Sequence, residues 1–342
     1  MTTGDHFIST TSTPPSHQAE QIKPILSLNG DVFLHRRCSR QYGLVKVRGY
    51  ADTSDSHVFI GELIHNTMED AAKHFAVKST AMSDAEFAAL LAAHHAELLG
   101  KGASPKAPQA VKIAGLKLMV LYRTMDDLGV LSNIESAEQM LTKTESDYIF
   151  QGRVDAVRAS SGDVELWDYK SGSDPRDLIK GVKGAALKAI WQRHLDDQAL
   201  QLRLYYDLYE ATYSKPPARC RLVYIGSVPC TLPPITTING TPPKELWASF
   251  TPTPMSASQW VAQESMAGLS GSGMFLEVPI SPPTIAAARY ELNTTAAAIV
   301  SQRETDDWPA PALVDAPDEE KTCSTCAVRS TCSVPRDRGH LS

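Results

Sequence analysis

The chain has 342 residues, of which 42% are hydrophobic and 21% charged, and its net charge at pH 7 is −6. This length can bury the core of one large domain or of a domain with insertions. The negative charge excludes a surface that is basic throughout, because affinity for the phosphate backbone of nucleic acid grows with the number of Lys and Arg contacts. Any path for nucleic acid must therefore be local.

Residues 1–25 are rich in Ser, Thr, Pro and His and carry no apolar segment of the kind found in a secretory signal, so we expect a disordered tail. No stretch reaches roughly 18 consecutive apolar residues, the length that predicts a membrane span. Six cysteines are too few for a disulfide framework in a chain of this length. These features predict a soluble, cytoplasmic protein without a membrane partner, folded as a single elaborated domain over residues 26–342.

The first motif lies on a helix predicted around residues 60–75. His65 and Glu69 are four residues apart and therefore share one helix face. Glycine precedes His65 by four residues, so the motif is GxxxHxxxE over residues 61–69. The alternative for His65 is a histidine satisfied at the edge of an amphipathic helix, whose apolar stripe would be Ile60, Ile64, Met68, Ala71 and Phe75.

Two further helices are predicted before any strand. Ser83 and Glu86 form a capping-box pattern that opens a helix ending at Leu99. The second helix runs from about Gln109 to Leu128, before a glycine. We expect residues 78–132 to form a helical insertion that leads into a sheet.

Three successive strands are predicted next, over residues 139–143, 148–157 and 164–169. The last two are rich in β-branched and aromatic residues and are separated by the turn residues 160–163. They predict a β-hairpin. Asp168 and Lys170 lie two residues apart on its second strand, so their side chains point to the same face.

This hairpin carries the parts of a metal-dependent nuclease centre. Mg²⁺ and Mn²⁺ prefer hard oxygen ligands, which Asp155 and Asp168 can supply. A lysine beside the metal, here Lys170, can orient or deprotonate the attacking water and offset charge on the phosphate. The alternative is an exposed hairpin on which these charged side chains are only solvated.

The remainder of the chain is predicted to contain a helix from about Leu195 to Tyr213, a strand over residues 221–226 and a helix over residues 284–303. Gln201 and Tyr205 share a face of the first helix, where core-edge packing is the alternative to a role in the site. Residues 228–282 are rich in proline and polar residues, and we expect an irregular insertion there.

Three cysteines near the end of the chain, Cys323, Cys326 and Cys332, form a CxxC pair followed by a third cysteine six residues later. A tetrahedral thiolate site needs a fourth ligand, for which Cys38 is the candidate. Cys220 and Cys230 do not enter this pattern.

These motifs, in this order, resemble the RecB-like branch of the PD-(D/E)XK nuclease superfamily. The lone upstream cysteine and the C-terminal CxxCx₅C resemble its iron–sulfur subgroup, which includes the AddB nuclease domain and CRISPR-associated exonucleases. The resemblance implies a restriction-endonuclease-like α/β fold, with an αβββαβ core, a mixed sheet, a helical insertion and a C-terminal Fe–S clasp. That clasp would join Cys38 to residues 323–332.

The resemblance also assigns roles to the motif residues. It implies that Asp155, Asp168 and the Tyr169 carbonyl hold one or two Mg²⁺ or Mn²⁺ ions, and that His65 is a further ligand or a phosphate contact. Glu69 would support His65. Gln201 and Tyr205 would line the active site and the path of the nucleic acid.

The same resemblance implies a 4Fe–4S cluster on the four clasp cysteines. Zn²⁺ is the alternative, because it also accepts four thiolates, and a site without metal is the third possibility. Either metal would tie together segments nearly three hundred residues apart in sequence, so its loss should loosen the domain.

Contacts to nucleic acid are expected from Arg153 and from a basic set beside the cluster cysteine, Arg36, Arg37 and Arg40. A second basic set follows the hairpin and consists of Arg176, Lys180, Lys183, Lys188 and Arg193. Ordinary solvation is the alternative for both sets. Trp167 and Trp191 could stack on bases, although core packing is the simpler interpretation for each.

The motifs predict a metal-dependent nuclease, and the resemblance implies that it is a deoxyribonuclease, an exonuclease or end-processing enzyme that acts on single-stranded or frayed DNA. It could work beside a helicase or another DNA-processing protein, in DNA repair or CRISPR adaptation. One alternative is a catalytically degenerate member of the fold that binds DNA or serves as a scaffold. Another is an adaptor or redox sensor whose functional centre is the cysteine cluster.

Overall fold

The structure is a computed structural model. It describes residues 23–50, 56–105, 107–160, 162–268 and 272–309, together with Cys323, Cys326, Val328 and Cys332. Of the tail predicted over residues 1–25, residues 1–22 lie outside the described residues. No helix in the described ranges is long and apolar enough to cross a membrane.

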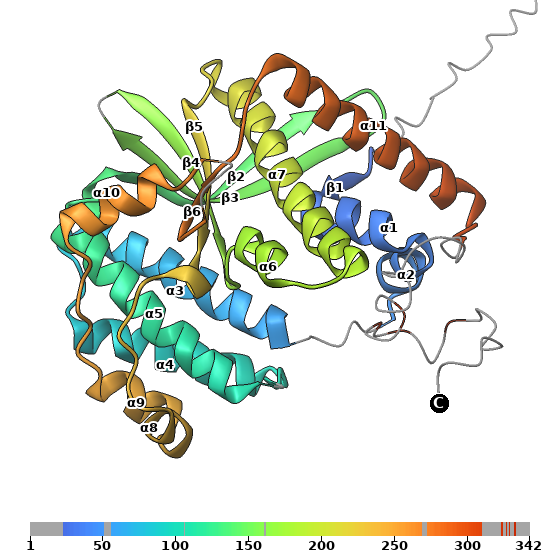
Figure 1. Cartoon of the computed structure of the whole chain (residues 1–342). Coiled ribbons are helices and arrows are strands. Elements are labelled where there is room, and N and C mark those ends of the chain that lie inside the picture. Colours follow the sequence, from blue (N-terminus) through green and yellow to red (C-terminus); the bar gives the residue numbers. More distant parts are fainter. Residues whose placement is uncertain are drawn as a thin grey trace, which may run out of the picture.

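A mixed six-stranded sheet forms the centre of the molecule (Figure 1). Its strand order is β1-β3-β4-β5-β6, and β2 pairs with β3. The β1–β3 and β4–β5 pairs are parallel, whereas the β2–β3, β3–β4 and β5–β6 pairs are antiparallel. The strands are β1 (Ile25–Ser27), β2 (Ile134–Thr144), β3 (Ile149–Ser160), β4 (Asp163–Lys170), β5 (Arg219–Tyr224) and β6 (Phe275–Glu277).

Helices cover the sheet and build two hydrophobic cores. One core packs α3, α4, α5 and α9 against Trp167 and Tyr169; the other packs α1, α7 and α11 against Phe150 and Leu222. The helices are α1 (Leu34–Arg37), α2 (Ser39–Tyr42), α3 (Ser56–Lys78), α4 (Asp84–Gly100), α5 (Pro108–Asp127), α6 (Pro175–Gly181), α7 (Ala185–Tyr213), α8 (Ile235–Gly240), α9 (Pro243–Ser249), α10 (Ala257–Ser265) and α11 (Pro282–Thr305).

The predicted core elements are present in the predicted order. Helix α3 is followed by the three strands β2, β3 and β4, then by α7 and β5. The capping box of Ser83 and Glu86 opens α4. The structure adds the three-residue strands β1 and β6, which are too short to leave a periodic pattern, and begins α7 ten residues before the predicted start, at Ala185.

The interpretation of residues 228–282 as irregular was wrong. This segment holds α8, α9, α10 and β6, which pairs with β5. Its prolines mark helix starts: Pro243 occupies the first turn of α9, where proline is tolerated because no hydrogen bond is lost. A capping box of Ser256 and Gln259 opens α10.

The sheet divides along strand β3. On one edge, β3 pairs with β1 only over Ile149–Gln151 and with β4 only over Ala156–Ser160. Strand β4 continues beside β5 as far as Lys170. Residues 152–155 therefore lie where β3 and β4 part, and side chains can reach into the space between them.

Close packing at Gly152 holds α7 against this division. A Cβ atom at that position would lie 2.7 Å from side-chain atoms of both Leu208 and Tyr205, which is closer than real Cβ contacts. Only glycine at position 152 therefore allows α7 to pack this closely against β3.

We predict that Gly152→Ala lowers the free energy of unfolding by about 1–3 kcal/mol, because Leu208 and Tyr205 must move. The matched control is Gly172→Ala, since a Cβ atom there meets nothing within 4 Å. Urea denaturation of both variants measures the difference. Equal stability of the two variants would contradict the packing described.

Candidate active site

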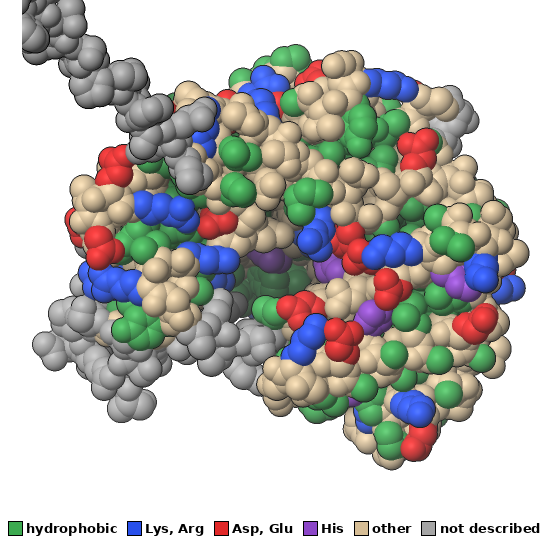
Figure 2. All heavy atoms as spheres, turned by 180° about the vertical axis from the view of Figure 1, so that it is seen from behind, with side chains coloured by type: hydrophobic (Ala, Val, Ile, Leu, Met, Phe, Trp, Pro, Cys, Tyr) green, Lys and Arg blue, Asp and Glu red, His purple; other side chains and the backbone are tan. Residues whose placement is uncertain are grey.

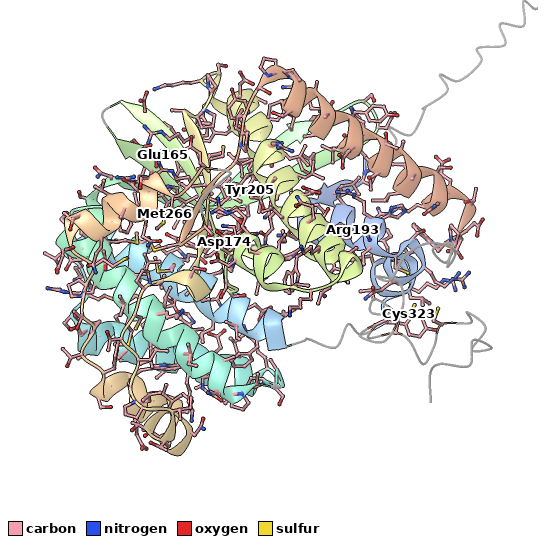
Figure 3. All side chains as sticks on the ribbon, viewed as in Figure 1. Glu165, Asp174, Arg193, Tyr205, Met266 and Cys323 are labelled. Carbon is pink, nitrogen blue, oxygen red and sulfur yellow. The ribbon has the colours of Figure 1, made fainter. Side chains whose placement is uncertain are left out.

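The predicted catalytic residues meet where β3 and β4 part, between α3 and α7. Asp155 comes from β3, Asp168 and Lys170 come from β4, His65 comes from α3, and Gln201 comes from α7. Figure 3 places Tyr205 over the strands on the α7 side of the sheet. The face seen in Figure 2 is hollowed near its centre, with histidine, basic and acidic side chains at the rim.

Gln201 joins Asp168 and Lys170, two charged residues near the end of β4. Its Nε2 donates to Asp168 Oδ1 at 3.0 Å and to the Tyr205 hydroxyl at 2.9 Å, while its Oε1 accepts from Lys170 Nζ at 2.8 Å. Lys170 Nζ also lies 2.5 Å from Asp168 Oδ2 and forms an ion pair with it. The structure thus brings Asp168, Lys170, Gln201 and Tyr205 together as one hydrogen-bonded group.

Asp155 is held across the gap between the strands. The backbone N–H of Tyr169 donates to Asp155 Oδ2 at 2.5 Å. On its other side, Asp155 Oδ1 lies 3.2 Å from His65 Nδ1. Asp155 therefore connects the β4 residues to the histidine of α3.

Glu138 on β2 also enters the site, although it belongs to none of the motifs recognised in the sequence. Its Oε1 lies 3.6 Å from His65 Nδ1, and its Oε2 lies 3.4 Å from Arg153 Nη1. The residue has φ +51°, the left-handed region that costs a non-glycine residue roughly 1–3 kcal/mol. One ligand atom each of His65, Glu138 and Asp155 lies within 4.8 Å of the others, a spacing suited to a metal ion.

Burial and charge shift the acid–base properties of this group. Burial alone would lower the pKa of His65, but the charge of Asp155, with hydrogen bonds to Asp155 and Glu138, outweighs it and raises the pKa to about 10. Burial raises the pKa of Asp168 to about 6, against the opposing charge of Lys170. Without a metal, His65 is therefore cationic at neutral pH and shields the surrounding carboxylates.

Two predicted residues contribute less directly. Glu69 pairs with Lys73 at 2.6 Å, one helical turn further along α3. Arg153 is 58% exposed beside Glu138, which leaves its guanidinium accessible to a phosphate.

The turn after Lys170 is anchored by its neighbours. Gly226 donates its N–H to the Gly172 carbonyl at 2.9 Å, and Lys117 of α5 donates to the carbonyl of Gly226. Asp174 and Arg176, both buried, form an ion pair at 2.6 Å. These contacts fix the end of β4 and with it Lys170.

The expectation that Arg176 belongs to a basic nucleic-acid path was wrong. Its guanidinium donates to Asp174 and to the Phe275 carbonyl inside the protein. In the other basic set, Arg36 pairs at 3.1 Å with both Asp197 and Glu291. Trp167 is fully buried in the core, as its simpler interpretation predicted.

The four clasp cysteines lie among the described residues. Cys38 caps the N-terminus of α2, where its Sγ accepts the Gln41 N–H at 3.3 Å. Burial raises the pKa of the Cys38 thiol, and the nearby thiols of Cys326 and Cys323 raise it further. Cys323 and Cys326 therefore lie near enough to Cys38 to act on its thiol, and Figure 3 marks Cys323 near the α1–α2 end of the molecule.

The sequence matches the PD-(D/E)XK nuclease superfamily over residues 31–333, and the chain belongs to this family. No curated protein matches the sequence. Among solved structures, a candidate exonuclease of Eubacterium rectale is similar at 10% identity and a TM-score of 0.47, covering 90% of this chain and 92% of that one. The structure of SSO0001 is similar at 14% identity and a TM-score of 0.29, covering 86% and 94%.

The raised pKa of Asp168 predicts how stability depends on pH in the metal-free protein. A buried acid whose pKa is about 6 instead of 3.8 destabilises the fold when it ionises, so stability is lost as pH rises through about 6. Asp168→Asn removes this loss. Its stability relative to wild type should rise by about 2 kcal/mol between pH 4 and pH 7.

Urea denaturation in a metal chelator across this pH range measures the difference. His65 does not interfere, because its stabilising charge is fully present below about 6.5 and is lost only toward about 10. A difference between Asp168→Asn and wild type that stays constant with pH would contradict the burial of an ionised Asp168.

Proposed function

We propose that this protein is a Mg²⁺- or Mn²⁺-dependent deoxyribonuclease, an exonuclease or end-processing enzyme that acts on single-stranded or frayed DNA. The observation that carries the proposal is the group of Asp155, Asp168, Lys170 and Gln201 at the division of the sheet. Family membership alone supports a nuclease; the metal and the substrate are inferred from these side chains.

The donor set fits a hard divalent cation. Asp155, Asp168 and the carbonyl of Tyr169 offer oxygen ligands, and His65 offers a nitrogen from the opposite side. Such an ion polarises the phosphate and lowers the pKa of a bound water. Lys170 is held by Gln201 beside Asp168, where it can orient the attacking water and offset charge on the phosphate. Arg153 would contact a neighbouring phosphate.

A single strand can reach this centre along α7. Leu187, Gln198, Gln201 and Tyr205 lie on one face of this helix. Along that face, burial increases from exposed Leu187 to the three buried residues. Trp191 and His194 lie between them in the sequence. Their rings meet edge to face with 6.1 Å between the ring centroids, and His194 shares a hydrogen bond of 3.0 Å with Gln198. Aromatic rings stack on unpaired bases, which favours single-stranded over duplex DNA.

We also propose that Cys38, Cys323, Cys326 and Cys332 hold a 4Fe–4S cluster, as in the iron–sulfur RecB-like subgroup. The spacing of these cysteines along the chain, a lone upstream residue and a C-terminal CxxCx₅C, supports iron–sulfur over zinc.

The rival functions have less support. A degenerate scaffold of the same fold does not need Asp168 and Lys170 joined through Gln201, and an adaptor or redox sensor built on the cysteines does not need the carboxylates. In the proposed account DNA is the partner, and a helicase or another DNA-processing protein could supply frayed ends.

The catalytic proposal predicts that Asp168→Ala and Lys170→Ala each reduce Mn²⁺-dependent degradation of single-stranded DNA by at least about 100-fold, because each removes a group that acts on the metal or the phosphate. Release of labelled nucleotides measures the rate, and circular dichroism checks the fold. The control is Asp163→Asn, an exposed position at the start of the same strand.

Full activity in either alanine variant would contradict the catalytic roles. If purified wild-type protein cleaves neither single- nor double-stranded DNA with Mg²⁺ or Mn²⁺, the enzyme proposal is wrong.

The cluster proposal predicts that protein purified without oxygen is brown, with broad visible absorbance and iron in the metal analysis. Cys326→Ser should lose the colour and part of the thermal stability, because the cluster links both ends of the chain. Cys230→Ser, outside the clasp, is the control. Persistence of the absorbance in Cys326→Ser would contradict the ligand assignment, and zinc in place of iron would contradict the cluster.

A further inference from the structure

A chain of hydrogen bonds leads away from the candidate active site toward the N-terminal part of α7. It begins at Tyr224, the last residue of β5, which lies opposite Lys170 in the parallel β4–β5 pair. The Tyr224 hydroxyl donates to Gln198 Oε1 at 2.7 Å, and Gln198 Nε2 lies 3.0 Å from His194 Nε2. Tyr224, Gln198 and His194 belong to none of the motifs recognised in the sequence.

His194 shares its face of α7 with Gln201, the residue that holds Lys170. Figure 3 labels Arg193 and Tyr205, which mark the two ends of this stretch of the helix. At a rise of about 1.5 Å per residue, His194 lies roughly 10 Å from Gln201 along the helix axis. A strand that reaches the catalytic group along α7 would therefore meet His194 at a phosphate other than the one that is cut.

The buried end of the chain determines which ring nitrogen of His194 carries the hydrogen. The Tyr224 hydroxyl is a buried donor, and Gln198 Oε1 is its one hydrogen-bond acceptor among the described residues. This bond fixes the orientation of the Gln198 amide, so that its nitrogen faces His194. An amide nitrogen donates and does not accept. His194 Nε2 is therefore the acceptor, and the ring is neutral with its hydrogen on Nδ1.

Two contacts also hold the plane of the imidazole. Gln198 is only 7% exposed, so its side chain cannot turn freely and keeps His194 Nε2 in place. The Trp191 and His194 rings meet at an angle of 74° between their planes. The exposed imidazole is thus oriented from the protein side before any ligand binds, which reduces the entropy lost on binding.

We propose that His194 binds a backbone phosphate of the substrate strand as a neutral Nδ1–H donor, and that Tyr224 and Gln198 are positioning residues that hold this tautomer. Phosphate is the ligand that suits such a donor, because every nucleotide presents the same acceptor oxygens whereas the base edges differ. The inference rests on the proposed function, since it adds a contact for the strand that the nuclease cuts.

The test is equilibrium binding of a fluorescent oligothymidylate of about 12 nucleotides to the full-length protein, measured by anisotropy at several KCl concentrations. No Mg²⁺ or Mn²⁺ is added, so that the strand is not cut. His194→Ala should bind about tenfold more weakly, with an unchanged dependence of affinity on salt. Removal of a cationic contact would instead reduce the slope of log K against log salt by about 0.7.

Two further variants show which ring nitrogen donates. His194→Asn places an amide N–H where Nδ1 lies and should keep most of the affinity. His194→Gln reaches the position of Nε2 and should bind as weakly as His194→Ala. The matched control is Gln192→Ala, which should bind like wild type, because Gln192 is exposed on the opposite side of α7 and pairs with Asp196.

A double-mutant cycle tests the positioning roles. Tyr224→Phe removes only the hydroxyl, which lets the Gln198 amide turn and His194 change tautomer, so binding should weaken. In the His194→Ala background the same change should have no further effect, whereas a general loosening of the fold would weaken binding in both backgrounds. Wild-type affinity or a reduced salt slope in His194→Ala, or the same effect of Tyr224→Phe in both backgrounds, would overturn the inference.

The binding assay also separates this inference from the nuclease proposal. Binding that depends on His194, in a protein that cleaves no DNA with Mg²⁺ or Mn²⁺, would support the phosphate contact and refute the nuclease. Cleavage by a protein whose His194→Ala variant binds the strand like wild type would do the reverse.

Discussion

The hydrogen bond from the Tyr169 N–H to Asp155 spans the gap where β3 and β4 part, and the geometry of the candidate active site depends on it. Tyr169 lies between Asp168 and Lys170, so one backbone contact fixes Asp155 relative to both. The Tyr169 side chain is buried in the core on the α3 side, which leaves its two neighbours to project together toward Gln201. Side chains alternate between the two faces of a strand, so Asp168 and Lys170 lie on the same face of β4. The single hydrogen bond at Tyr169 therefore fixes Asp155 near both of them.

Charge balance explains why these buried groups are tolerated. Two carboxylates in a dry site repel each other, and burial raises the pKa of Asp168 to about 6. Lys170 on one side and cationic His65 on the other offset that repulsion in the absence of a metal. A divalent cation would take over the same role, so binding it should release the proton of His65.

Much of this arrangement follows from local sequence pattern. The spacing of Asp168 and Lys170 predicted that they share a strand face. The four-residue spacing of Gln201 and Tyr205 predicted that they share a face of α7, where the structure joins them by a hydrogen bond. The capping box at Ser83 could also be predicted from the sequence, because its partner Glu86 is only three residues away. These features depend on neighbours within one turn or one strand, and sequence periodicity records such relations directly.

Other features depend on strand pairing and on contacts between residues far apart in the sequence, which no local pattern of residues predicts. Glu138 reaches the site because β2 pairs with β3 in one register and because its backbone adopts a positive φ. The role of Arg176 was mistaken, since its charge is neutralised by Asp174 and by a carbonyl about a hundred residues away. Strands as short as β1 and β6 exist only because longer strands lie beside them.

The central claim is that Asp155 organises a divalent-metal centre at the division of the sheet. Anomalous diffraction from crystals grown with Mn²⁺ tests it most directly. The account predicts a strong peak beside the Asp155 carboxylate, on the side that faces Asp168. Crystals that bind Mn²⁺ elsewhere but show no peak within about 3 Å of Asp155, a generous limit for a coordinating oxygen, would contradict it.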